Sequence, residues 1–384
     1  MVLAKPVINE RGQVLLRQNI PLTQDYITTL KRRGYTSIYI NDGDTDDIQI
    51  EEILSQDAQR QAQATLALVF DFVEQVSTNI NHTQSEAIVA DLHDPGVANA
   101  LRGHEGFKQL EQMVSTILDN LLESDTVTSI AQIRNHNDII FSHSVNVTTT
   151  ALMIGKRLHL NQKDLERLGA GCLLHDIGKI FLDQTILHEH KSSSLNPVQL
   201  FTLQREHPRL GYELLRTRNP DASLINHVAL EHHERQDGRG YPRGLRGTNK
   251  VERISKDPQN VTLIAEIAAV ADVYDILSAE KPGRSALTPQ QITDTMHRLS
   301  GTFLNREITQ LFLSMLPALP LGIGIVVQTG RYTGYKGVVA QTNQKQPERP
   351  LVRLLYNPQG DRIMPIELDL GRESNITVEA TLSL

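Results

Sequence analysis

Histidines and carboxylates crowd one stretch of the chain. Ten of the 14 histidines lie between residues 136 and 233, far more than even spacing would give. Several adjoin another side chain that can bind a metal, as in His175-Asp176 and His232-His233. Imidazoles and carboxylates without thiolates favour ions such as Fe, Mn, Zn or Ni. The pattern therefore predicts a metal site that activates water and clamps a phosphoryl group.

The side chains expected at this site come from separate segments. Adjacent helical residues point about 100° apart, so a His-Asp pair cannot grip one ion as residues i and i+4 would. The pair instead suits a cluster in which Asp176 bridges two ions and His175 binds one of them. Asp272 lies in an apolar helical pattern, where an unpaired carboxylate would be costly. The expected ligands are His143, His175, Asp176, His207, His232, His233 and Asp272.

The elements that must position these residues are predicted to be mainly α-helical. Residues 1–53 read as a small α/β unit with a helix over 23–33, and 54–135 as a helical linker broken over His82–Gly106. Residues 136–316 keep the helical pattern and form the expected catalytic domain. After Pro317 the runs become β-rich and are separated by turn residues, which predicts a β-unit over 317–384.

Bulk composition excludes several classes. The 384 residues carry a net charge of −7, which argues against a general nucleic-acid binder. The N-terminus has no apolar signal segment and no run is long enough to span a membrane, so we expect a soluble, cytoplasmic protein without membrane insertion. The single cysteine, Cys172, is expected in the core. The acidic loop 41–47, NDGDTDD, lacks the ligand spacing of a calcium loop and is expected to be a solvated turn.

Several motifs resemble those of the HD-GYP phosphodiesterases. Residues 175–179, HDIGK, resemble the core of that family, and 232–242, HHERQDGRGYP, match its HHExxDGxGYP signature at every fixed position. His143-Ser144 and His207-Pro208 resemble the family's HS and HP elements. Asp272 lies in a segment similar to its AxADxxDAL helix. The similarity is strongest over residues 110 to 316.

The resemblance implies a helical fold that holds two or three divalent ions, often iron or manganese. The implied substrate is cyclic di-GMP, opened to pGpG and in some members cleaved on to GMP. Position by position, it makes the seven residues above metal ligands and gives Asp176 and Lys179 catalytic roles. It also implies substrate contacts from Lys179, Gly240, Tyr241, Lys281 and Arg284. Helices within 54–135 could form a signalling linker or a homodimer interface, or pack on their own domain.

Three departures from the family pattern modify these expectations. Members with three metals carry a Glu one turn before the HS histidine, where this chain has Ile139, so we expect two ions. The RPYR-like segment reads Lys281-Pro282-Gly283-Arg284, which lacks an aromatic side chain and one Arg fork. The stretch between His233 and Asp272 is longer than usual, and its extra residues, around 248–260, could form a lid or an obstruction.

Two alternatives to a cyclic di-GMP phosphodiesterase remain open from sequence. The first is a non-catalytic cyclic di-GMP receptor, which binding without turnover would reveal. The second is a hydrolase of another nucleotide, such as a cyclic GMP-AMP dinucleotide.

Overall fold

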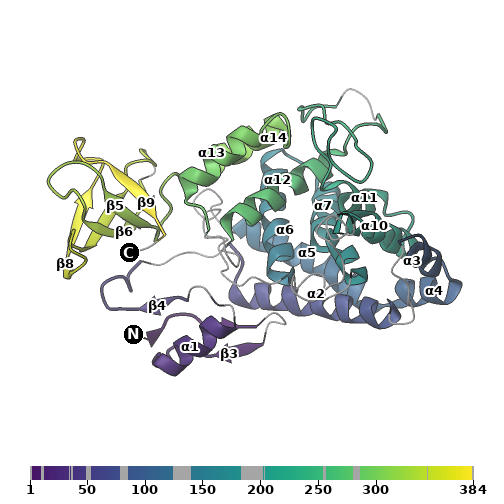
Figure 1. Ribbon diagram of the computed structural model, residues 1–384, viewed down its shortest axis with the longest axis horizontal. Helices are drawn as coiled ribbons and strands as arrows, with labels where there is room; N and C mark the ends of the chain where they lie inside the picture. Colours follow the sequence, from purple (N-terminus) through teal and green to yellow (C-terminus); the bar gives the residue numbers. More distant parts are fainter. Residues whose placement is uncertain are drawn as a thin grey trace.

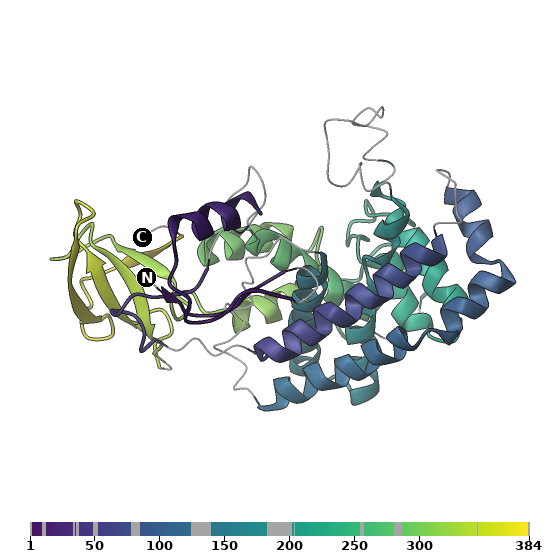
Figure 2. The same cartoon turned by 90° about the horizontal axis from the view of Figure 1, so that it is seen from below.

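The structure, a computed structural model, describes residues 2–9, 13–33, 35, 38–48, 53–77, 85–123, 140–182, 202, 204–253, 257–279, 286–343 and 345–382. Figure 1 shows a helical domain flanked at one end by the N-terminal unit and the C-terminal β-sheet, and Figure 2 shows the same arrangement from below. This mainly α architecture with two small flanking units confirms the predicted fold class. Within the described residues, no helix is both long and apolar enough to cross a membrane.

The helical domain is built around one continuous hydrophobic core, which extends from Ile53 to Met315 and includes the buried, unpaired Cys172. Within it, helix α12 (Leu263–Ser278) is buried at 12 of its 16 positions. The helices are α2 (Gln56–Ser77), α3 (Ser85–Leu92), α4 (Pro95–Gly103), α5 (Glu105–Glu123), α6 (Ile140–Arg157), α7 (Gln162–Leu174), the 3-10 helix η2 (Ile177–Phe181), α10 (His207–Arg218), α11 (Ser223–Glu231), α12 (Leu263–Ser278), α13 (Pro289–Leu299) and α14 (Arg306–Met315).

Helices α2 and α5 belong to this core. Their side chains Leu66, Val69, Leu110 and Ile117 are buried in the same cluster as those of α6 and α7. The expectation that these helices pack on their own domain thus accounts for their apolar faces. A homodimer through residues 54–135, like the predicted domain boundaries, stays a prediction.

The expected break over His82–Gly106 is wrong for its described part, which contains α3 and α4. Asp94 caps α4 by accepting hydrogen bonds from the backbone N–H groups of Gly96 and Val97, at 2.7 and 3.3 Å. Pro95 follows at the first helical position, where its missing N–H costs no helical hydrogen bond. The proline therefore starts a helix here.

The N-terminal unit pairs short strands around one helix. Strand β1 (Val2–Leu3) pairs with β4 (Ile40–Asn41), and β2 (Val7–Ile8) pairs with β3 (Val14–Leu16), both antiparallel. Helix α1 (Gln24–Arg32) begins after Thr23, whose hydroxyl accepts the N–H of Tyr26. The predicted helix over 23–33 is thus confirmed.

The C-terminal unit is a five-stranded antiparallel sheet in the order β8-β7-β6-β5-β9. Its strands are β5 (Gly324–Val327), β6 (Lys336–Gln341), β7 (Leu351–Tyr356), β8 (Arg362–Asp369) and β9 (Val378–Thr381). Alternate residues of β5 and β7 point into a separate small core that includes Ile325, Val327, Val352 and Leu354. This unit is consistent with the predicted β-rich extension.

The acidic loop of the N-terminal unit docks on this sheet, which corrects the expectation of a solvated turn. Arg353 on β7 donates to both carboxylate oxygens of Asp47, at 2.5 and 2.8 Å, and to the carbonyl of Asp44 at 2.7 Å. Arg362 on β8 pairs with Asp42 at 2.9 Å and with Asp44. We call these five residues the clasp. The guanidinium groups of Arg353 and Arg362 thus join the C-terminal sheet to the N-terminal unit.

Candidate metal centre

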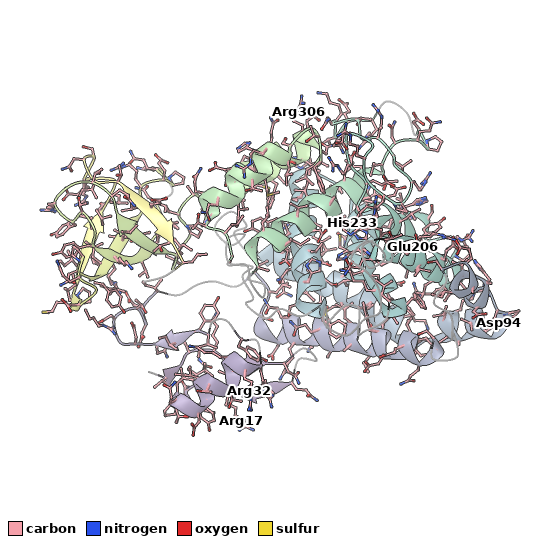
Figure 3. All side chains as sticks on the ribbon, in the orientation of Figure 1. Arg17, Arg32, Asp94, Glu206, His233 and Arg306 are labelled. Atoms are coloured by element: carbon pink, nitrogen blue, oxygen red, sulfur yellow. The ribbon has the colours of Figure 1, made fainter. Side chains whose placement is uncertain are left out.

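The centre lies where α6, η2, α10, α11 and α12 meet. Figure 3 labels His233 in the interior of the helical domain, near α10, α11 and α12. Helix α7 ends at Leu174, and the chain turns through His175 and Asp176 into η2. Both side chains at this turn are buried, with exposed fractions of 1% and 2%.

Gly178 lets η2 touch α10. A Cβ atom at this position would lie 2.0 Å from the carbonyl oxygen of His207 and 2.5 Å from the amide nitrogen of Gly211. Only glycine fits such an approach of two backbones. The glycine of HDIGK therefore sets how close Asp176 and His207 come.

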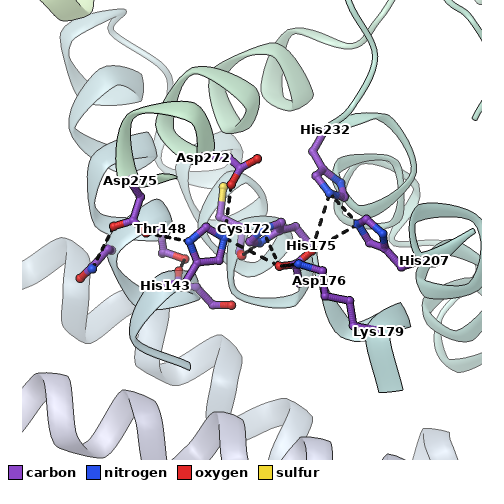
Figure 4. Close-up of polar contacts among 12 residues, drawn as sticks. His143, Thr148, Cys172, His175, Asp176, Lys179, His207, His232, Asp272 and Asp275 are labelled. Carbon is purple, nitrogen blue, oxygen red and sulfur yellow. Dashed lines mark hydrogen bonds and ion pairs between the residues drawn. The ribbon is translucent and has the colours of Figure 1, made fainter. Parts of the chain in front are cut away.

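The first cluster comprises His143, His175 and Asp176, whose ligand atoms lie within 4.8 Å of one another. Nε2 of His143 lies 3.7 Å from Oδ2 of Asp176 and 3.2 Å from Oδ1 of Asp272. Nε2 of His175 lies 3.5 Å from Oδ2 of Asp176. The imidazoles of His143 and His175 thus converge on one carboxylate oxygen of Asp176 (Figure 4).

The second cluster comprises His207, His232 and His233, whose ligand atoms also lie within 4.8 Å of one another. His207 opens α10, and the adjacent pair follows the end of α11. Nε2 of His207 and Nε2 of His232 lie 3.3 and 3.8 Å from Oδ1 of Asp176. Oδ1 of Asp176 therefore faces this cluster while Oδ2 faces the first one, as a bridging carboxylate would.

The donor set suits divalent cations. Nδ1 of His207 donates to the carbonyl of Gln204 at 2.7 Å, and Nδ1 of His232 donates to that of Ala229 at 2.9 Å. These bonds leave a lone pair on each Nε2, and the two Nε2 atoms lie only 3.2 Å apart. Two lone pairs that converge in this way repel each other unless a cation lies beside them. The clusters therefore fit metal ions, with a carboxylate shared between two sites.

Burial and charge set the protonation of these groups. Burial lowers the pKa values of His175, His232 and His233, which favours neutral imidazoles that can bind a metal. Burial raises the pKa of Asp176, but the charge of Lys179 and the nearby imidazoles outweigh it and hold this pKa well below its usual range. The carboxylate thus stays ionised.

Without a bound metal, His143 and Asp272 form an ion pair of an imidazolium and a carboxylate. Burial lowers the pKa of His143, but hydrogen bonds to Asp272 and Asp275 outweigh it and raise the pKa to about 10. Burial raises the pKa of Asp272, and its hydrogen bond from His143 more than offsets this, giving about 2. Asp272 is thus paired within the buried helix α12, which removes the cost foreseen from sequence.

Lys179 and Tyr241 border the clusters. Nζ of Lys179 lies 2.5 Å from Oδ2 of Asp176, while 31% of the lysine side chain is exposed. The ring of Tyr241 stacks on His233, with 4.7 Å between centroids and 28° between planes. Gly240 permits this contact, because a Cβ there would lie 2.5 Å from Cα of Glu234. The glycine thus packs inside its own loop.

Glu234 holds the signature loop together. Its carboxylate accepts the backbone N–H groups of Arg243, Gly244 and Leu245 at 2.7, 3.1 and 2.8 Å. Asp237 pairs with Arg235 at 2.6 Å and accepts the N–H of Arg239. Both acids therefore shape the loop rather than face the clusters.

The described part of the lengthened segment is not a lid over the clusters. Arg253 pairs with the buried Glu266 near the start of α12, and Lys250 pairs with Glu307 on α14 at 2.6 Å. Glu266 lies six residues before Asp272, about 9 Å along the helix. The segment is thus anchored away from the metal-binding end of α12. Residues 254–256 lie outside the described residues.

The structure brings together all seven residues predicted as metal ligands. The positions 139, 281, 283 and 284 lie outside the described residues, so the expectations for Ile139, Lys281, Gly283 and Arg284 stay predictions. Sequence reasoning missed Asp275, whose Oδ2 accepts Nδ1 of His143 at 2.7 Å and whose Oδ1 accepts Asn146 at 3.0 Å. Its position three residues after Asp272, on the same face of α12, was an available signal.

Comparisons with known proteins agree with this geometry. Residues 126–308 match the family model described as "HD domain". The chain is 25% identical over 287 residues to the cyclic di-GMP phosphodiesterase PA4108 of Pseudomonas aeruginosa, covering 74% of this chain and 64% of the relative.

Two further similarities each cover less than half of this chain. The cyclic di-GMP phosphodiesterase response regulator RpfG of Xanthomonas campestris pv. campestris is 32% identical, over 43% of this chain and 41% of the relative. The 3'3'-cGAMP-specific phosphodiesterase 1 of Vibrio cholerae is 31% identical, over 44% and 36%. The chain thus spans less than two thirds of the length of each of these relatives.

Four findings point to the same family. They are the HD pair, the intact GYP signature, the two clusters joined by Asp176 and the match over residues 126–308. Residues 126–308 thus match the HD-domain family, and their signature motifs are those of the HD-GYP type.

Proposed function

We propose that this protein is a metal-dependent phosphodiesterase that opens cyclic di-GMP to pGpG and cleaves this product more slowly to GMP. The observation that carries the proposal is the division of the Asp176 oxygens between two ligand clusters, whose imidazole nitrogens lie 3.3 to 3.8 Å away. Relatives named cyclic di-GMP phosphodiesterases support the substrate. The two clusters support two divalent ions, for which we propose Fe or Mn.

The proposed ligands follow from the two clusters. His143, His175 and Asp272 would hold one ion, and His207, His232 and His233 the other, with Asp176 shared. Two ions held in this way supply Lewis acidity, which activates water and neutralises phosphoryl oxygens during in-line displacement.

The chain's own residues would then position the substrate. Lys179 is held next to Asp176 but stays part-exposed, so its ammonium group can reach a phosphate oxygen and stabilise developing negative charge. Tyr241 borders the second cluster, where its ring can shape the nucleotide pocket. The near-complete burial of His175, Asp176, His207 and His232 keeps bulk water from the ligand atoms. Gly240, Lys281 and Arg284 are proposed to complete the substrate site.

A test would use protein purified without oxygen, its metal content measured by mass spectrometry, and cyclic di-GMP with products separated by chromatography. We expect pGpG, followed by GMP, with loss of activity on addition of chelator. Asp176→Ala should abolish turnover, and Asp164→Ala, a surface carboxylate on α7, is the matched control. Metal-loaded protein that binds cyclic di-GMP but leaves it intact would refute the enzyme and favour a receptor.

A second substrate deserves a parallel assay, because the chain is 31% identical to a 3'3'-cGAMP-specific phosphodiesterase over 44% of its length. Equal concentrations of both dinucleotides should be compared. A higher kcat/KM for 3'3'-cGAMP would overturn the choice of cyclic di-GMP while leaving the reaction class intact.

A further inference from the structure

His233 differs from the other clustered histidines in how its ring is oriented. His143 donates from Nδ1 to Asp275, and His175, His207 and His232 donate from Nδ1 to backbone carbonyls. Among the described residues, no such hydrogen bond to a ring nitrogen of His233 is present. A metal-binding imidazole needs a fixed orientation, which a neighbour outside the ligand set usually provides. Among the described residues, the His233 ring is contacted instead by the packing of neighbouring rings.

The packing partner is Tyr241, and Arg205 lies on it. The Tyr241 ring stacks on His233 at 4.7 Å, and the guanidinium carbon of Arg205 lies 4.4 Å from the Tyr241 centroid. His207 meets His233 edge-on, with 5.0 Å between centroids. A guanidinium over an aromatic face is attracted by the ring's negative quadrupole. The three groups therefore form one stack that ends at the second cluster.

The stack also links two loops. Arg205 lies two residues before His207, in the turn that precedes α10, where its N–H donates to the carbonyl of Thr202 at 3.2 Å. Tyr241 belongs to the GYP loop and donates its backbone N–H to the carbonyl of His233 at 3.2 Å. The Arg205 contact thus joins the loop that bears His207 to the loop that bears His233.

We propose that Arg205 is a positioning residue, which holds Tyr241 against His233 and so orients this imidazole in the second cluster. The role rests on the proposed function only in that His233 is taken as a metal ligand. Arg205 acts through Tyr241, so its effect should vanish once the Tyr241 ring is absent.

The test is a double-mutant cycle on the full chain, with Arg205→Ala, Tyr241→Leu and the double variant. Arg205→Ala removes a part-buried cation–π contact, so we expect kcat to fall roughly 5- to 30-fold. The double variant should equal Tyr241→Leu alone. Arg205→Lys should restore part of the rate, whereas the uncharged Arg205→Met should not. Additive losses in the double variant would overturn the proposal, because Arg205 would then act independently of the ring.

A readout without turnover keeps the test separate from the proposed function. With 3-fluorotyrosine placed at position 241, the fluorine NMR signal of the substrate-free protein should shift and broaden in Arg205→Ala. Metal content should fall toward half because the second cluster loses its fixed imidazole. Arg218→Ala is the matched control, since Arg218 lies 4.4 Å from the Phe107 centroid at the far end of α10.

The fluorine signal and metal content decide the role of Arg205, and turnover by the wild type decides the proposed function. An unchanged fluorine signal and full metal content in Arg205→Ala would overturn the proposal, even if KM for the dinucleotide rose. A wild-type protein that hydrolyses neither dinucleotide would refute the proposed function, while the fluorine and metal measurements would still decide the role of Arg205. Thermal unfolding of every variant separates loss of position from loss of fold. Arg218→Ala loses a comparable cation–π contact and its ion pair with Glu111, so it should lower stability without changing the fluorine signal or the metal content.

Discussion

Replacing Gly178 by alanine should separate the two halves of the metal centre. The added methyl would lie 2.0 Å from the His207 carbonyl oxygen, at least 1.0 Å inside the closest distance that real Cβ atoms show. The atoms that the methyl group would meet belong to the backbone of α10, so no side-chain rotation can relieve the clash. Helix α10 must therefore move away from η2, and it carries His207 with it.

The displacement of α10 sets the expected loss of stability and of rate. Overpacking of a closed backbone contact costs about 3 kcal/mol of unfolding free energy. A shift of about 1 Å at a positioned group can lower the rate about 100-fold. We therefore expect Gly178→Ala to fold at 25 °C, to unfold at lower urea concentration, and to lose most of its kcat/KM.

The assay is urea unfolding followed by circular dichroism, with metal content and turnover measured on the same preparations. Gly103→Ala is the matched control, because a Cβ there meets nothing within 4 Å and alanine favours the helix. The control should be as stable as the wild type or slightly more so. A Gly178→Ala protein with wild-type unfolding, metal content and rate would show that η2 and α10 do not set the spacing of the clusters.

Three further perturbations test other contacts. Asp176→Ala should abolish metal loading as well as turnover, and two retained metals with a near-normal rate would refute the bridging assignment. Asp275→Ala removes the acceptor of His143 and should weaken metal affinity about 10- to 100-fold in a chelator competition, whereas unchanged affinity would mean that the ring is held by other contacts. Arg353→Asp should expose the clasp to protease, and the charge swap with Asp47→Arg should restore protection; no change in cleavage at low salt would argue against a stable clasp. The hydrogen bond from Arg353 lowers the pKa of Asp47, so its contribution is complete above about pH 4 and is lost as pH falls through the folded pKa.

Local sequence patterns predicted the elements that depend on local forces. The helix over 23–33 follows from Thr23 as a cap and a regular apolar face, and it appears as α1. The C-terminal extension was predicted only as a β-rich unit, because strands such as β8, which holds Pro365, lack a clear alternation of buried and exposed residues. The break expected over His82–Gly106 was wrong because its Pro95 lies in the first turn of α4, which proline favours, and not in a helix interior, which proline would break.

The sequence by itself identified the residues that form the two clusters. His175, Asp176, His207, His232 and His233 are recognisable because their residue types and motif spacings are local properties of the chain. Hydrophobic periodicity likewise determined that helices would carry them, since it requires each helix to bury one face.

Only the tertiary structure decided how these residues meet. The contact of His143 with Asp275 spans 132 residues, and the clasp of Arg353 with Asp47 spans 306. No periodicity records such pairs, because they depend on which helix faces and loops pack together. The division of the Asp176 oxygens, the approach of Gly178 to His207 and the stack that ends in Arg205 all arise from that packing.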